Sequence, residues 1–200
     1  MHYFCLKEFY MRWNKSILIS LLLMTLVAAL YRIIPGRPYG FAPQWAIAVF
    51  AGAVIRDRKW AFIMPVISMF LSDLLFQVLY LKGMSAIPGF YDGQWQNYLL
   101  FALMAAFGMM IRKFRPLSIF LASLGAPSAY FILSNFVLWA GWSGTRGFGR
   151  PKTFGGLIQC YNDALPFYPA SVAATVLFSA ILFGTFYLIG RRSSTALARA

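Results

Sequence analysis

The chain has 200 residues, of which 60% are hydrophobic and 12% charged, and its formal net charge is +13. A soluble domain carries about 25% charged residues, so this composition argues against an ordinary soluble fold. It predicts an all-α integral membrane protein, because a bilayer accepts apolar runs of about 20 residues as helices. The basic residues form short clusters between apolar runs, which favours topology and contact with membrane lipids over nucleic-acid binding.

Six apolar runs predict about six spanning helices in one compact bundle. In chain order they are residues 16–34, 41–55, 60–81, 97–111, 117–142 and 169–189. The first run also resembles the apolar part of a signal peptide, but the long basic segment before it and the membrane run after it favour a retained span. The second run is the weakest, since it lies near the lower limit of length for a span.

The distribution of basic residues predicts the orientation of the bundle. Twelve of the 18 Lys and Arg residues lie before the first run, after the second and fourth runs, and after the sixth. The positive-inside rule then places both termini in the cytoplasm. We therefore expect a cytoplasmic segment at 1–15, a transmembrane domain at 16–190 and a basic cytoplasmic tail at 191–200. The inner connections are short, whereas the outer ones, 82–96 and 143–165, are longer and are expected to be loops.

Asp73 is the most informative single residue, because a carboxylate within a span is costly and needs a partner. Gln77 and Tyr80 follow at helical spacing, so all three are expected on one face, toward the outer half of the membrane. Arg32, near the outer end of the first span, is the predicted ion partner. A substrate-binding group and a purely structural clamp both fit this pattern.

A second polar and aromatic stripe rises toward the outer side in the fifth run, where Asn135 precedes Trp139 by one turn. The outer loops add aromatic rings, amides and arginines, which suit a pocket for a flat or anionic small molecule. From these loops the candidate substrate-binding residues are Tyr91, Trp95, Arg146, Tyr161 and Asn162.

Small residues recur at helical spacing in the first two runs. Ser16 and Ser20 form one such step, and Ala48 and Gly52 form another. Small side chains let a second helix approach closely, so these faces favour either packing within the chain or docking of a partner subunit.

Catalysis and cofactor binding have little support in the sequence. The single histidine is His2, the two cysteines Cys5 and Cys160 form no metal-binding motif, and no paired carboxylates or serine elbow occur. We therefore expect no enzyme activity, no bound metal and no cofactor.

Three stretches carry a resemblance to a known family. They read RIIPGRPYGFAP from Arg32, AIAVFAGAVIRDRKWAFIMPVISMFLSD from Ala46 and PKTFGGLIQCYNDALPFY from Pro151. In this order they resemble an uncharacterised bacterial family of six-span membrane proteins that is similar to the S components of energy-coupling factor (ECF) transporters. The resemblance covers most of the chain from Arg32 to Tyr168.

The resemblance implies a substrate-binding subunit in the bacterial cytoplasmic (inner) membrane that captures a vitamin or similar micronutrient at its outer face. It would then dock a coupling subunit and two ATPases, and Ser16 and Ser20 occupy a place comparable to the docking residues of S components. The alternative is a structural or assembly subunit of a larger membrane complex without small-molecule transport.

Overall fold

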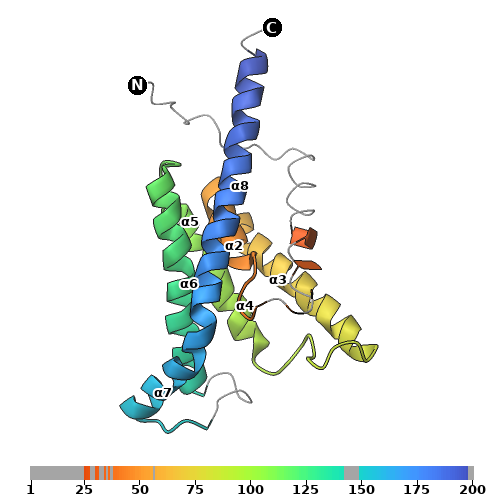
Figure 1. Cartoon of the computed structure of the whole chain (residues 1–200), viewed down its shortest axis with the longest axis vertical. Coiled ribbons are helices and arrows are strands. Elements are labelled where there is room, and N and C mark those ends of the chain that lie inside the picture. The colour runs from red at the N-terminus through yellow and green to blue at the C-terminus, as the bar shows by residue number, and fades with distance from the viewer. Residues whose placement is uncertain are drawn as a thin grey trace.

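The computed structural model describes residues 25–27, 30–31, 34, 36, 38–55, 57–141 and 149–197, the last nine of these by their backbone alone. This part of the chain is helical, with no strand (Figure 1). Its elements are α2 (Gln44–Val54), α3 (Arg58–Leu81), α4 (Gln94–Leu103), α5 (Ala105–Met109), α6 (Pro116–Trp139), α7 (Phe154–Ala164), the 3-10 turn η3 (Leu165–Phe167) and α8 (Tyr168–Leu197).

Three helical segments in the described residues are long and apolar enough to cross a membrane: α3, α6 and the stretch Phe154–Leu188. Helices α3 and α6 have 24 residues each, hence a length of about 36 Å, more than the hydrocarbon core of about 30 Å. The prediction of an all-α membrane protein is confirmed at this level. The count of six spans and the orientation stay predictions, and most of the first run lies outside the described residues.

Helix α2 lies at the centre of the bundle. It has 11 residues, about 16 Å, and nearly all its side chains are buried. It packs closely against α5, because a Cβ on Gly52 would lie 1.9 Å from the carbonyl oxygen of Ala105 and one on Gly108 would lie 1.9 Å from that of Val49. The small face of the second predicted run therefore accommodates another helix of the same chain.

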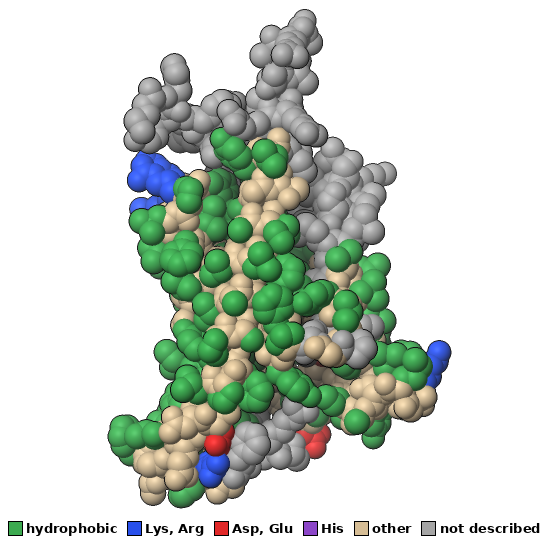
Figure 2. All heavy atoms as spheres, in the orientation of Figure 1, with side chains coloured by type: hydrophobic (Ala, Val, Ile, Leu, Met, Phe, Trp, Pro, Cys, Tyr) green, Lys and Arg blue, Asp and Glu red, His purple; other side chains and the backbone are tan. Residues whose placement is uncertain are grey.

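The two ends of the bundle differ in the connections that lie there. At one end lie the turn between α2 and α3 and the connection 110–115 between α5 and α6 (Figure 1), and both Val54 and Ile111 belong to the hydrophobic core. We call it the basic end, since Lys and Arg side chains gather there over the α5–α6 connection (Figure 2). At the opposite end lie α7 and the connection 82–93 between α3 and α4 (Figure 1). We call this connection the strap and this end the strap end.

Two sequence predictions about these elements were wrong. The stretch 143–165 was expected to be a loop, but its second half forms helix α7, so that Cys160 lies on a helix. Helix α7 has an amphipathic pattern and begins at a proper N-cap, Thr153, whose side chain accepts from Gly156 N at 3.2 Å. The fourth predicted run is two helices, α4 and α5, that meet at Met104, and α4 begins earlier than expected, at Gln94.

Candidate functional site

Asp73 lies on α3 with 2% of its surface exposed. Gln94 Nε2 donates to Asp73 Oδ2 at 2.5 Å, and the Tyr98 hydroxyl donates to the same oxygen at 2.9 Å. Both donors lie on α4 at positions i and i+4, and this spacing places them on the same helix face. A buried carboxyl group needs such bonds to offset the hydration it loses. Helix α4 therefore supplies a pair of donors that matches the carboxyl group of α3.

The strap is held over this carboxyl group by two glutamine side chains. Gln77 Oε1 accepts from the backbone N–H of Gly89 at 3.0 Å and of Phe90 at 3.2 Å. Gln94 Nε2 also donates to Gly89 O at 3.0 Å, and Gln94 Oε1 accepts from Tyr91 N at 3.2 Å. Side-chain amides thus take the place of backbone partners for three consecutive strap residues.

Gly89 brings the strap into direct contact with α3. A Cβ at this position would lie 1.9 Å from the backbone oxygen of Asp73 and 2.4 Å from the backbone nitrogen of Gln77. No side chain fits there without moving the strap. At the far end of the strap Gly93 adopts a left-handed φ of 77° immediately before α4, a conformation that glycine adopts at no steric cost. The strap is therefore anchored in its middle and turns sharply into α4.

A second network extends from the strap toward the centre of the bundle. Asn97 Nδ2 donates to the Tyr91 hydroxyl, and the Tyr130 hydroxyl donates to Asn97 Oδ1 at 3.2 Å. The Tyr130 ring lies 4.1 Å from the Trp45 ring, and Trp45 lies 4.9 Å from Phe101 (centroid distances). This network links α2, α4 and α6 to the strap. Its aromatic rings and hydroxyl and amide groups are of the kinds that line small-molecule sites.

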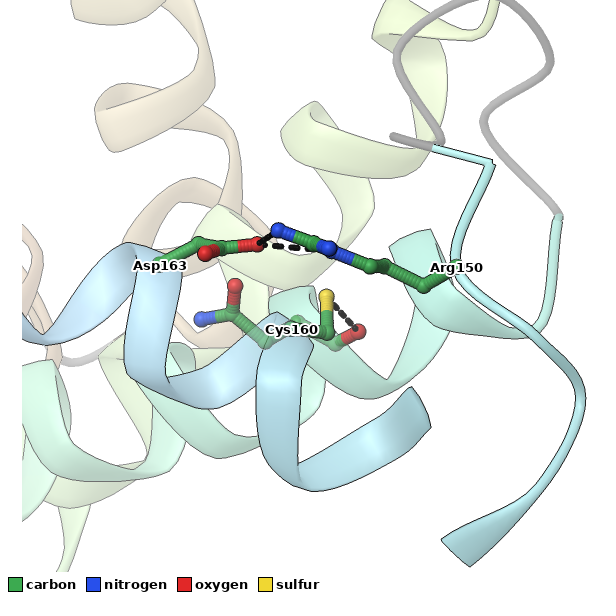
Figure 3. Close-up of polar contacts among 4 residues, drawn as sticks. Arg150, Cys160 and Asp163 are labelled. Carbon is green, nitrogen blue, oxygen red and sulfur yellow. Dashed lines mark hydrogen bonds and ion pairs between the residues drawn. The ribbon is translucent and has the colours of Figure 1, made fainter. Parts of the chain in front are cut away.

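Helix α7 is docked on the C-terminal turns of α6 through backbone carbonyls. Asn135 is buried, and its Nδ2 donates to the carbonyl of Phe131 at 2.7 Å, so its amide satisfies its own helix. The Cys160 thiol donates to the Asn135 carbonyl at 3.6 Å (Figure 3), and the Tyr161 hydroxyl donates to the Ile132 carbonyl at 2.9 Å. These bonds fix the orientation of α7 relative to α6.

The segment before α7 is tied down in the same way. Trp139 Nε1 donates to Pro151 O at 2.9 Å, and Lys152 Nζ donates to Trp139 O while lying 5.6 Å from the centre of the Trp139 ring. Arg150 points toward Asp163, with Nη2 and Oδ2 at 2.6 Å (Figure 3). The two cations of this segment are therefore neutralised or held within the chain.

A family profile matches residues 12–197, nearly the whole chain. The chain belongs to this family, a family of unknown function (DUF6580). No curated protein and no solved structure matches the chain. Family membership therefore leaves the function to be argued from the residues of the strap end.

The structure brings only some of the predicted site residues together. Asp73, Gln77 and Tyr91 all belong to the networks around the strap. Tyr80 is 44% exposed although it follows Asp73 at helical spacing, because α3 diverges from the bundle toward its C-terminal end (Figure 1). Trp95 is 56% exposed.

The remaining predicted residues fall into two groups. Asn135, Trp139 and Tyr161 lie at the separate junction of α6 and α7, and Asn162 on α7 is exposed. Arg32 and Arg146, and the predicted docking residues Ser16 and Ser20, lie outside the described residues. The pairing of Asp73 with Arg32 therefore stays a prediction.

Sequence reasoning missed the residues that hold Asp73 and the strap. Gln94 was read as part of an outer loop, and Tyr98 as part of the fourth apolar run, whereas both donate to the Asp73 carboxyl group. The sequence does contain a signal for this pairing, because the two hydrogen-bond donors lie four residues apart at the start of α4, the helix that follows α3 and its carboxyl group. Within the described ranges no three His, Cys, Asp or Glu side chains lie together as a metal site would require.

Proposed function

We propose that this protein is the substrate-binding membrane subunit of an ECF-type importer, similar to S components, for a vitamin or similar micronutrient. Substrate binds at the strap end, which faces the outside of the bacterial cytoplasmic membrane. The chain has six spans, has no enzyme activity of its own, and works with a coupling subunit and ATPases that dock from the other side.

The orientation in this proposal rests on the unequal distribution of charge. At the basic end the first turn of α3 carries Arg58 and Lys59, and the connection 110–115 carries Arg112, Lys113 and Arg115. Cytoplasmic loops carry such an excess of Lys and Arg, so the basic end is assigned to the cytoplasm and the strap end to the outside.

The observation that carries the proposal is the polar cluster beneath the strap, in which Asp73 and Gln94 are buried. Asp73, Gln77 and Gln94 are polar groups placed where a bundle stabilised by packing alone has apolar side chains. Aromatic residues border the cluster, and the strap is hydrogen-bonded to two of its side chains, Gln77 and Gln94. Convergent polar groups next to aromatic rings are the usual composition of a small-molecule site, and these lie at a single end of the bundle.

The direct test is to identify what the protein binds. The chain is expressed in a bacterium, purified in a mild detergent and examined by native mass spectrometry for a co-purifying small molecule. It is then heated with a panel of vitamins and other micronutrients, and a hit raises its melting temperature. Co-purification of a coupling subunit and ATPases is tested from the same membranes.

Matched variants connect a hit to the proposed site. Asp73→Asn and Trp95→Ala are expected to weaken binding of the hit at least tenfold, because they remove the buried carboxyl group and an exposed aromatic ring of the same end. Asp57→Asn, an exposed carboxylate at the basic end, is the control and leaves binding unchanged. The proposal fails if no compound of the panel shifts the melting temperature and no ATPase co-purifies.

A structural or assembly subunit is the second candidate, and one observation favours it. Asp73, Gln77 and Gln94 all hydrogen bond within the chain, as a clamp that only fixes the strap would do. In that case Asp73→Asn releases a partner protein from the purified complex and leaves the uptake of every micronutrient unchanged. A transport subunit gives the opposite result, with uptake lost and no other complex affected.

A further inference from the structure

The exposed cations of the two ends differ in how they are partnered. At the strap end Arg150 forms an ion pair with Asp163, and Lys152 is held by the carbonyl and the ring of Trp139. These two side chains have their anionic or polar partner within the chain. Among the described residues of this end, the exception is the exposed Lys82, which directly follows α3.

At the basic end the cations have no such partners. Arg58, Lys59, Arg112, Lys113 and Arg115 are all exposed, and among the described residues none of their side chains forms an ion pair or a hydrogen bond. The acid next to them is Asp57, and its carboxylate accepts from the backbone N–H of Lys59 at 2.9 Å as an N-cap. We call these five cations the basic patch. Five like charges in a small area therefore lack an anion in the described chain.

The surroundings of the basic patch indicate which anion fits. The cations lie on the first turn of α3 and on the connection 110–115 at the same end of the bundle, and Figure 2 shows Lys and Arg side chains at this end next to a hydrophobic surface. Large exposed apolar side chains border the patch, namely Trp60, Met110 and Leu117. Where α3 and α6 cross a bilayer, these apolar side chains reach the hydrocarbon and the cations stand at the level of the head groups.

We propose that the basic patch binds the phosphate head groups of anionic phospholipids in the leaflet at the basic end. Unpartnered guanidinium and ammonium groups supply the charge, and the neighbouring apolar side chains hold the acyl chains. This inference does not depend on transport, since a scaffold with the same patch would bind the same lipids. Each cation near an anionic surface contributes about a fivefold gain in affinity.

The test measures lipid binding to the purified full-length protein. Phosphatidylglycerol and phosphatidylcholine with identical acyl chains are titrated into the detergent-solubilised protein, and bound lipids are counted by native mass spectrometry. The wild type is expected to prefer phosphatidylglycerol at least tenfold. The triple variant Arg112→Gln, Lys113→Gln, Arg115→Gln is expected to lose about two orders of magnitude of this affinity, with phosphatidylcholine binding unchanged.

Single substitutions give a matched control. Lys113→Gln is expected to lower the affinity for phosphatidylglycerol about fivefold, whereas Lys82→Gln, which removes an equally exposed lysine at the strap end, leaves it unchanged. If the triple variant does not fold, Arg58→Gln with Lys59→Gln tests the part of the patch that lies on α3.

The proposal is overturned if the wild type shows no preference for phosphatidylglycerol. It is also overturned if Lys82→Gln and Lys113→Gln reduce binding equally, or if the triple variant keeps its lipids but loses an acidic partner protein. The last result would assign the patch to protein docking.

Discussion

Substitution of Gln94 by alanine isolates the bonds that close the strap over Asp73. The change removes the donor to the Asp73 carboxyl group, the donor to the Gly89 carbonyl and the acceptor for the Tyr91 N–H. The Tyr98 hydroxyl still donates to Asp73, and Gln77 still accepts from two backbone groups of the strap. We therefore expect the strap to open more often while the helices stay packed.

The size of the effect follows from the two lost bonds that join Gln94 to the strap, since its third bond joins α4 to Asp73 on α3. A hydrogen bond in a folded protein contributes about 1 kcal/mol net, so the free energy of strap opening falls by about 2 kcal/mol. Hydrogen exchange of amides that exchange through this opening then accelerates by about thirtyfold. The Gly89, Phe90 and Tyr91 amides report the opening directly, because their partners are glutamine side chains.

Hydrogen-exchange mass spectrometry of the detergent-solubilised protein measures this acceleration in peptides from 84–93. Gln77→Ala is expected to accelerate the same peptides through the Gly89 and Phe90 amides. Gln159→Ala on the exposed side of α7 is the matched control and leaves the strap unchanged. Two results would refute the reasoning: strap exchange at the wild-type rate in the Gln94 variant, or an equal acceleration in peptides of α6 and α8, which would indicate global loosening.

Two further predictions concern the rest of the fold. Gly52→Ala or Gly108→Ala is expected to lower the free energy of unfolding by about 1–3 kcal/mol, because α2 and α5 must separate to admit a methyl group. Gly184→Ala, with open space around the glycine, is the control and is neutral or slightly stabilising. Chemical denaturation in mixed micelles compares the three variants. Arg150→Gln is expected to change stability by less than about 1 kcal/mol, since both side chains of its ion pair with Asp163 are more than a third exposed; a loss of several kcal/mol in the same assay would contradict this.

The long helices were predictable from the sequence because their signal is local. Runs predicted at 60–81 and 117–142 correspond to α3 and α6, whose bounds differ by at most three residues from the prediction. Helix α7 was missed because it is short and glycine-containing, and it lies within a stretch read as loop from its charges. Its apolar face is visible only when the residues from Phe154 are placed at helical spacing.

The candidate site was predictable only in part, since its bonds join residues distant in the chain. The cost of a buried carboxyl group marks Asp73 from the sequence alone, but its donors Gln94 and Tyr98 are 21 and 25 residues away. Gly89 gave no signal at all, because its role depends on the backbone of α3 lying within contact distance. Residue type therefore identified Asp73 as a candidate, whereas its hydrogen-bond partners depend on the packing of the helices and the strap.

The strap also supplies a way to distinguish transport from scaffolding. In the proposed transport function, a solute that binds at Asp73 displaces the strap and breaks its bonds to Gln77 and Gln94, so binding and opening are thermodynamically linked. A ligand that binds the open form raises the rate of hydrogen exchange in residues 84–93, and a ligand that is enclosed by the strap lowers it. A substrate that binds at Asp73 is therefore expected to change this rate. A scaffold has no such linkage. The exchange rate of one short segment, measured with and without a candidate micronutrient, therefore separates the two functions even before uptake is assayed.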